Sequence, residues 1–241
     1  MASYKKLFLQ AALNGNRDHP ALPRSPEELA AEARAAVEAG ADSLHFHAYD
    51  IHGRETLEAG AVAAALRAVR AAGPGIPLSL TTFAEIEPDP NRRKGLVAAW
   101  TELPDLVTAN MGETGIFELC DLLLERGIAI EAGLLSLNDA RMFVASGIAP
   151  KCRRALVEPL NSDPDEAVAL ADAIEQLLTE NGIQLQQVHH GDGIASWAVN
   201  RRAVARGHGI RTGLEDTPVL PDGRLASGNA ELVAAAAALF R

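Results

Sequence analysis

Residues 25–47, SPEELAAEARAAVEAGADSLHFH, contain a complete helix–strand unit and show how the rest of the chain is built. Ser25, with Glu28 three residues later, is typical of a helix N-terminus, and Gly40 ends the alanine-rich helix that follows. From residue 41 apolar and polar side chains alternate, which is the pattern of a β-strand. A helix that leads directly into a strand is the building block of parallel sheets.

The same alternation of short apolar runs and longer amphipathic segments extends along the whole chain. Eight strand–helix pairs in 241 residues predict an α/β protein, a single-domain (β/α)8 TIM barrel formed by residues 1–241. A doubly wound open sheet is the alternative, because periodicity alone does not reveal closure. The expected strands are residues 6–13, 41–47, 76–82, 105–110, 128–132, 154–159, 185–190 and 210–213, and the expected helices are residues 26–39, 56–72, 91–100, 114–126, 137–146, 164–180, 194–206 and 229–240.

The composition is that of a globular, enzyme-like protein, with 48% hydrophobic and 22% charged residues. The net charge of −10 opposes the basic surface that a nucleic acid partner requires. Because no apolar run is long enough to cross a bilayer and the first residues lack a signal-peptide pattern, we expect no membrane partner. With only two cysteines, Cys120 and Cys152, a disulfide framework is not expected, which fits a cytoplasmic location. Both are interpreted as buried apolar residues.

Two histidines share one face of the strand predicted over residues 41–47. Alternation sends His45 and His47 to one side of this strand and Leu44 and Phe46 to the other. Imidazole is a favoured zinc ligand, and this spacing lets both rings reach one ion. Two unrelated polar residues at the end of a strand are the alternative interpretation.

In a TIM barrel the active site lies at the carboxyl ends of the strands, so polar residues there are candidates. Strands eight, one and two become neighbours when the barrel closes, which lets Glu215 lean toward His45 and His47. Two histidines and one carboxylate that leave a position open for substrate form a catalytic zinc arrangement. Alternatively, Glu215 and Asp216 only cap the last loop. The polar residues at the predicted strand ends are His45, His47, Thr81, Thr82, Thr108, Asn110, Glu131, His189, His190, Arg211, Glu215 and Asp216.

Several segments resemble one known family. Residues 207–216, GHGIRTGLED, and 227–233, SGNAELV, resemble the closing signature of the β-keto acid cleavage enzymes. Residues 39–47, AGADSLHFH, resemble the zinc-binding strand of that family, and Gly53 and Arg54 match the turn that follows it. The resemblance extends over nearly the whole chain. Further segments in matching places are residues 11–15, Asn110, Gly112 and Glu131.

The resemblance implies a TIM barrel with one zinc ion per chain, bound by His45, His47 and Glu215. It implies a reaction in which a β-keto acid and the co-substrate acetyl-CoA give acetoacetate and a new acyl-CoA. Asp216 and Arg211 are then the acid–base pair that acts on the substrate. A β-keto acid offers a ketone and a carboxylate that can chelate Zn²⁺ together, and the ion polarises the ketone. The family also implies a homo-oligomer, a dimer or a tetramer.

Supporting roles fall to other residues at the strand ends. Thr81 ends strand three where the family tends to carry a substrate-binding serine, and its hydroxyl keeps the same hydrogen-bonding capacity. Glu131 is predicted to orient Asp216 or a water and so to take part in catalysis. Each of these side chains could instead satisfy backbone groups of the loops. The candidate substrate-binding residues are Thr81, Thr82, Thr108 and Asn110.

The chain departs from the family pattern at three places, which leaves the particular β-keto acid open. Residues 48–52, AYDIH, stand where the family usually has Val-Arg-Asp, and residues 81–84, TTFA, replace its usual Ser-Thr-Gly-Gly. The end of strand seven, with His189 and His190, is unusual as well. Each of these two histidines is interpreted as a further zinc ligand or substrate contact, or as an ordinary hydrogen-bonded side chain.

Two other classes of function stay open from the sequence. A metal-dependent hydrolase of the amidohydrolase kind also carries His-x-His on a barrel strand, but on the first strand and with histidines after strands five and six. Here those strands end in Glu131 and in Glu158-Pro159. A non-catalytic barrel that binds a small acid is the third hypothesis, and the intact set of Arg211, Glu215 and Asp216 argues against it.

Overall fold

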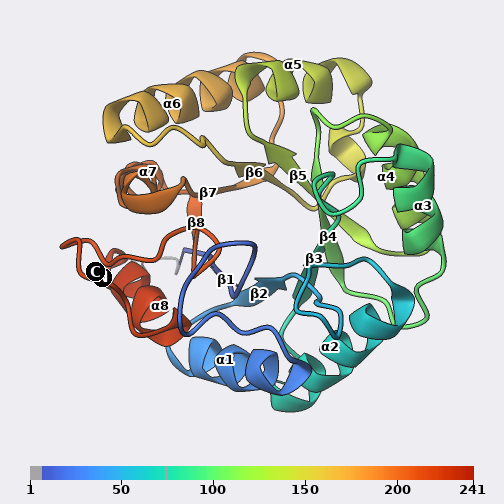
Figure 1. Cartoon of the computed structure of the whole chain (residues 1–241). Helices are drawn as coiled ribbons and strands as arrows, with labels where there is room; N and C mark the ends of the chain where they lie inside the picture. Colours follow the sequence, from blue (N-terminus) through green and yellow to red (C-terminus); the bar gives the residue numbers. More distant parts are fainter. Residues whose placement is uncertain (1–6, 74) are drawn as a thin grey trace.

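The computed structural model describes residues 7–73 and 75–241, and the start of the predicted first strand at residue 6 lies outside the described residues. Eight parallel strands form a closed barrel in chain order, with helices around the outside (Figure 1). The strands are β1 (Leu9–Ala12), β2 (Ser43–Phe46), β3 (Leu78–Thr81), β4 (Leu106–Asn110), β5 (Ala129–Leu134), β6 (Arg154–Val157), β7 (Gln186–His189) and β8 (Gly209–Thr212). The helices are α1 (Pro26–Glu38), α2 (Ala59–Ala72), α3 (Pro90–Ala98), α4 (Ile116–Glu125), α5 (Leu137–Ser146), α6 (Pro164–Glu180), α7 (Ser196–Ala205) and α8 (Asn229–Ala238), with the short 3-10 helices η1 (Ala149–Lys151) and η2 (Gly193–Ala195).

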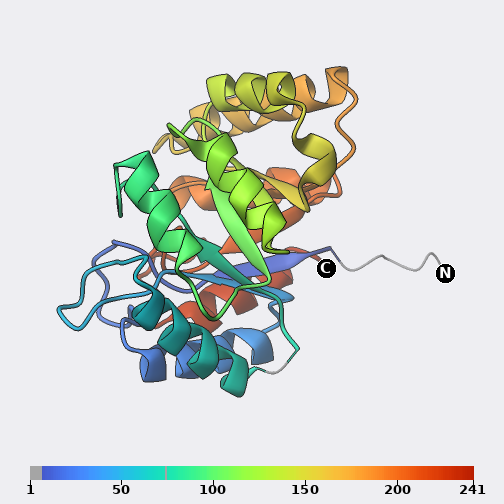
Figure 2. The same ribbon diagram turned by 90° about the vertical axis from the view of Figure 1, so that its right-hand side faces the viewer.

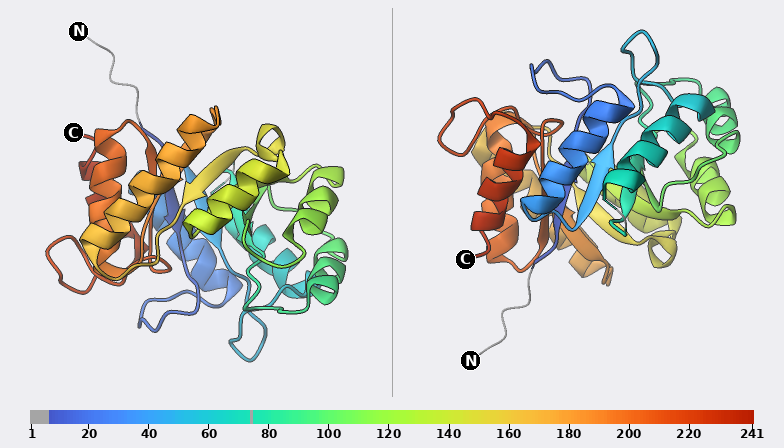
Figure 3. Two further views of the ribbon diagram at one scale, coloured as in Figure 1. Left: turned by 90° about the horizontal axis from the view of Figure 1, so that it is seen from above. Right: turned by 90° about the horizontal axis from the view of Figure 1, so that it is seen from below.

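Pairing of β1 with both β2 and β8 closes the sheet and rules out the doubly wound alternative. All the expected strands and helices form, and their ends differ from the predicted ends by at most a few residues. The largest shift within the helices is at α2, which begins at Ala59 rather than at residue 56. Helix α7 begins at Ser196 because residues 193–195 form η2 first. Views from other directions show the helices lying outside the strands (Figures 2 and 3).

Local sequence signals fix the ends of several helices. Ser25 caps α1 and forms a capping box with Glu28, whose backbone N–H donates to the Ser25 hydroxyl. Asp163 caps α6 in the same way, through the N–H groups of the first turn. Gly147 ends α5 in the left-handed conformation that glycine adopts without strain.

The main core lies between the barrel and the surrounding helices. Leu29 of α1 and Leu66 of α2 are fully buried there, and Trp100 donates its indole N–H to the Leu57 carbonyl. Burial of this kind stabilises the fold by roughly 1.5–3 kcal/mol for each large apolar side chain. Among the described helices, none combines the length and the apolar character that a bilayer span needs.

Close backbone contact between β8 and β1 places the last loop beside the mouth of the barrel. Gly213, just after β8, has a φ of 153°, and a Cβ there would lie 1.9 Å from the Ala12 carbonyl oxygen. Only glycine fits this approach. The Glu215 N–H then donates to that same carbonyl, which fixes Glu215 over the end of β1.

Candidate active site

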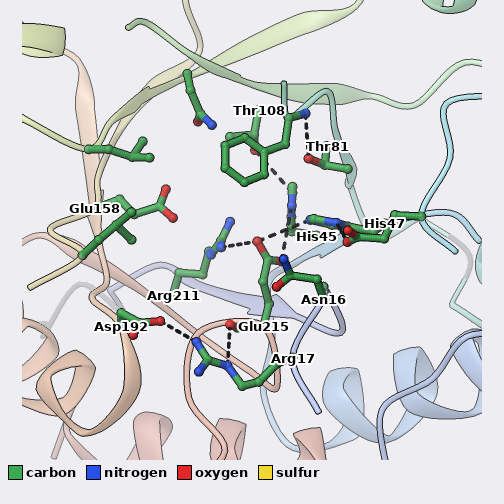
Figure 4. A pocket seen from close by; sticks show the side chains of 16 residues that line it. Asn16, Arg17, His45, His47, Thr81, Thr108, Glu158, Asp192, Arg211 and Glu215 are labelled. Carbon is green, nitrogen blue, oxygen red and sulfur yellow. Dashed lines mark hydrogen bonds and ion pairs between the residues drawn. The ribbon is translucent and has the colours of Figure 1, made fainter. Parts of the chain in front are cut away.

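A pocket of about 140 Å³ opens at the carboxyl ends of the strands, where the TIM-barrel fold predicts it (Figure 4). It contains the predicted metal-ligand set and four other candidates, Arg211, Thr81, Thr108 and Asn110. Its small size suits a small acid at the base of the pocket. The lining residues are Gly15, Asn16, Arg17, His45, His47, Glu55, Thr81, Phe83, Thr108, Asn110, Leu135, Glu158, Leu160, Asp192, Arg211 and Glu215.

His45, His47 and Glu215 converge on one point, as the sequence predicted. The Nε2 atom of His45 lies 3.5 Å from Glu215 Oε2, and the Nε2 atom of His47 lies 3.4 Å from Glu215 Oε1. Ligands about 2.0–2.1 Å from a tetrahedral zinc ion are about 3.3–3.4 Å apart, so these separations match an ion between them. His47 Nε2 and Glu215 Oε2 are buried without a hydrogen-bond partner within the described chain. The donor set therefore fits a divalent metal.

The other ring nitrogen of each histidine is already engaged. His45 Nδ1 lies 3.1 Å from the Ser79 hydroxyl, and His47 Nδ1 pairs with the Glu55 carboxylate. Asn14 accepts a hydrogen bond of 2.8 Å from the His47 N–H, which fixes the backbone beneath the ring. Metal-binding histidines commonly donate their second N–H in this way, because it fixes the tautomer and aims the lone pair.

Sequence reasoning missed both of these supporting side chains. Ser79 lies two residues before Thr81 on the same face of β3, so strand periodicity could have identified it. Glu55 lies in the loop after β2, and nothing in its spacing indicates that it pairs with His47. Arg17 was missed as well; it pairs with Asp192 at the rim of the pocket and donates to the Glu215 carbonyl.

The two histidines have opposite electrostatic settings. Burial lowers the pKa of His45 to about 3, so its ring is neutral at neutral pH and its lone pair is free for a metal. Burial also disfavours charge on His47, but the carboxylates of Glu215 and Glu55 outweigh it and raise the pKa of His47 to about 9. A metal that binds here has to displace the proton of His47.

Arg211 and Asp216 form a buried ion pair beside the pocket. Arg211 Nη2 donates to Asp216 Oδ1 at 2.7 Å and to Glu215 Oε1 at 2.8 Å. Burial raises the pKa of Asp216, but Arg211 and His190 lower it further and keep the carboxylate ionised at neutral pH. Both side chains are buried, but Arg211 lines the pocket and Asp216 is not among the lining residues.

The structure gives Glu131 different neighbours from those expected. Its carboxylate is fully buried inside the barrel and contacts Gln10, Ser79 and Arg154, with Thr108 at the edge of hydrogen-bonding distance. The expected orientation of Asp216 by Glu131 has no support in these contacts. The reason is depth, because Glu131 lies in the layer of side chains beneath the pocket.

The four candidate substrate-binding residues divide into two groups. Thr81, Thr108 and Asn110 line the pocket, and Asn110 donates to Glu113 at 3.1 Å. Thr82 is turned away from it, because its hydroxyl donates to the Thr108 carbonyl at 3.0 Å. Thr82 therefore satisfies a backbone group, which was the alternative interpretation of these residues.

His189 and His190 point to different sides of β7. His189 faces outward, stacks on His208 with ring centroids 4.8 Å apart and lies near Glu175. These three residues could geometrically bind a metal, but Arg202 and Arg206 already pair with Glu175. Two guanidinium groups repel a cation, so we interpret this cluster as a polar network between β7, α6 and α7. His190 faces inward, between Glu158 and Asp216.

The fold and the pocket define a TIM-barrel protein with a candidate metal site at the carboxyl ends of its strands. The profile of the family described as beta-keto acid cleavage enzyme matches residues 6–241, and the chain belongs to this family. The expected family and barrel fold are thereby confirmed. The protein is thus an enzyme of the class that cleaves β-keto acids.

A curated relative and two solved structures extend the comparison. The chain is 25% identical to the 3-keto-5-aminohexanoate cleavage enzyme of Fusobacterium nucleatum subsp. nucleatum, over 95% of this chain and 89% of that protein. The complex of ObcA with oxaloacetate superposes with a TM-score of 0.68 and 17% identity, over 89% of this chain and 62% of ObcA. The 3-dehydroquinate dehydratase of Aquifex aeolicus gives a TM-score of 0.60 and 13% identity, over 97% of both chains. At such low identities the two structures show the shared barrel alone.

Proposed function

We propose that the protein is a zinc-dependent β-keto acid cleavage enzyme that uses acetyl-CoA as co-substrate. The observation that carries this proposal is the convergence of His45, His47 and Glu215, with His47 Nε2 and Glu215 Oε2 buried and unpartnered at one point. Family membership supplies the reaction class. The acyl group R–CO of the β-keto acid R–CO–CH2–COO⁻ passes to CoA and gives the new acyl-CoA. The remaining CH2–COO⁻ unit joins the acetyl group of acetyl-CoA, and the two leave together as acetoacetate.

His45, His47 and Glu215 would hold Zn²⁺, which would supply a Lewis acid for the ketone of the substrate. The hydroxyls of Thr81 and Thr108 and the amide of Asn110 line the same pocket and provide hydrogen bonds for the substrate carboxylate. Phe83 and Leu160 line it as well, so apolar side chains accompany these polar groups.

Arg211 and Asp216 move the proton in this proposal. Asp216 accepts a proton from the carbon between the ketone and the carboxylate, and Arg211, which donates to Asp216 Oδ1 at 2.7 Å, keeps this carboxylate ionised. Arg211 faces the pocket and stabilises the negative charge that develops on the substrate. Its ion pair with Glu215 at 2.8 Å also couples the acid–base pair to a metal ligand.

The amidohydrolase alternative is less well supported. His45 lies on β2 and His47 directly follows it, and no histidine stands between residues 53 and 188, so none follows β5 or β6. We keep the predictions of a cytoplasmic location and of a homo-oligomer, a dimer or tetramer, as part of the proposal.

The first experiment measures metal content by mass spectrometry on the purified native protein and on the His45→Ala/His47→Ala variant. We expect about one zinc per chain in the native protein and none in the variant. His52→Ala is the matched control, because His52 is exposed in the loop after β2 and is not among the pocket residues. Native protein that stays free of transition metal after zinc is added would refute the site.

The second experiment tests the reaction on the zinc-loaded protein. A panel of β-keto acids is incubated with acetyl-CoA, and acetoacetate and the new acyl-CoA are measured by mass spectrometry. Both products should form in equal amounts and should disappear in the double variant. If the protein binds zinc but forms neither product from any acid of the panel, the metal site is supported and the proposed reaction is refuted.

A further inference from the structure

His190 is a fully buried histidine whose two ring nitrogens face two carboxylates. Its Nδ1 lies 3.4 Å from Asp216 Oδ1, and its Nε2 lies 3.4 Å from Glu158 Oε2. Neither nitrogen has a closer hydrogen-bond partner in the described residues, and neither reaches solvent. A buried polar atom in this situation is costly unless it is paired.

The two carboxylates beside His190 determine whether its imidazole ring is protonated. A neutral imidazole donates at one nitrogen only, so two carboxylates are satisfied together only by the protonated ring. Burial and Arg211 of β8 lower the pKa of His190, but Glu158, just after β6, and Asp216, in the loop after β8, outweigh them and raise it to about 9. His190 is therefore a buried cation at neutral pH.

The two carboxylates lie in different places. Asp216 is buried and is not among the pocket residues, whereas Glu158 lines the pocket with a side chain that is 16% exposed. Figure 4 shows Glu158 on the other side of Arg211 from His45 and His47. His190 thus connects the buried acid–base pair to a carboxylate that reaches the substrate space.

We propose that His190 is a positioning residue that ties Asp216 to Glu158 and thereby holds Asp216 against Arg211 and Glu158 at the pocket wall. This inference rests on the proposed function, because it takes Asp216 as the base. Without His190, Glu158 lacks its closest counter-ion, and Arg211 is the cation that remains near it. Glu158 would then compete with Asp216 and Glu215 for one guanidinium.

The charge bridge itself can be measured without any activity. We propose NMR titration of the ¹⁵N-labelled imidazole rings in the zinc-loaded protein, with His190→Gln to assign the His190 signals. His190 should titrate near pH 9, and Glu158→Gln should lower its pKa by about 1 unit or more, because an opposite charge has been removed. A His190 ring that is neutral at pH 7, or one that is unaffected by Glu158→Gln, overturns the bridge.

The positioning role is tested by kinetics. His190→Gln should lower kcat by about tenfold to a hundredfold through misplacement of Asp216, while KM stays within about threefold and zinc content is unchanged. His52→Gln, in an exposed loop outside the pocket, is the matched control and should keep the native kcat. Native kcat in His190→Gln refutes the role.

The experiments also cover a His190→Gln variant that does not fold and a native protein that shows no activity. If His190→Gln does not fold, Glu158→Gln takes its place in the kinetic comparison, because Glu158 is partly exposed and glutamine has the same shape. A loss of kcat of the same kind is expected there, and its absence refutes the role. If the native protein releases no acetoacetate from any β-keto acid, the proposed function fails, whereas the NMR titration still decides whether the bridge exists.

Discussion

Replacement of Glu131 by glutamine tests the ion pair inside the barrel. Glu131 is fully buried and lies 3.3 Å from the Arg154 guanidinium, which is only 3% exposed. Glutamine keeps the shape and can still accept hydrogen bonds from Ser79 and Gln10, so the change removes mainly the negative charge. The Arg154 cation is then left in the barrel without its carboxylate.

The expected loss of stability follows from this geometry. At an effective dielectric constant of about 20, unit charges 3.3 Å apart attract by about 5 kcal/mol. Removal of one partner of a buried pair costs about 3–5 kcal/mol. Arg154 keeps its contact with the Phe8 ring, 4.0 Å from the ring centroid, which stabilises a cation by about 1–2 kcal/mol. We therefore expect the free energy of unfolding to fall by about 3 kcal/mol.

Urea denaturation followed by tryptophan fluorescence measures this change. With an m-value of about 3 kcal/mol/M, the midpoint of Glu131→Gln should fall by about 1 M. Glu131→Gln/Arg154→Met removes both charges and should recover more than half of the loss, because no stranded cation remains. A single variant within about 0.5 kcal/mol of the native protein, or a double variant no more stable than Glu131→Gln, refutes the reasoning.

Two further predictions concern the backbone and the metal. Gly213→Ala should destabilise the protein by at least about 3 kcal/mol in the same urea assay, because its Cβ would meet the Ala12 carbonyl oxygen, whereas Gly60→Ala in α2 has open space and should add up to about 1 kcal/mol. Zinc affinity, measured with a competing chelator, should rise about tenfold per pH unit from pH 7 to 9, because metal binding must remove the proton that His47 carries below its raised pKa of about 9. A zinc affinity that is independent of pH in this range would contradict the argument that zinc displaces a proton from His47.

Much of the fold was predictable because its signals are local. Helix caps such as Ser25 and the change from helical to strand periodicity depend on neighbouring residues in the chain, and both are present where predicted. The approach of Glu215 to His45 and His47 followed from one further assumption, that the barrel closes. Closure places the loop after β8, which carries Glu215, beside β1 and β2, and this does not depend on the conformation of the loops.

The depth of each side chain was not predictable, because it depends on how neighbouring strands are staggered. His45 pairs in register with Ser79, and Thr81 pairs with Thr108, which in turn pairs with Glu131. The strand ends therefore do not lie at one level, and Ser79 reaches the His45 ring although Thr81 is nearer the end of β3. The same stagger places Glu131 beneath the pocket, where the sequence gives no sign of its partners.

The polar layer beneath the pocket has a physical consequence for the metal site. Apolar residues of similar volume in place of Glu131 and Arg154 would often be as stable as the ion pair or more so, so stability alone does not explain these charges. Their contacts offer a reason: Glu131 accepts a hydrogen bond from the Ser79 hydroxyl, and the Ser79 oxygen in turn lies 3.1 Å from His45 Nδ1. These two contacts fix the tautomer of His45 that leaves its Nε2 atom free for the metal. Ser79→Ala removes the middle of this series of hydrogen bonds and should therefore bind zinc more weakly than the native protein. Equal affinity would show that these hydrogen bonds do not serve the metal.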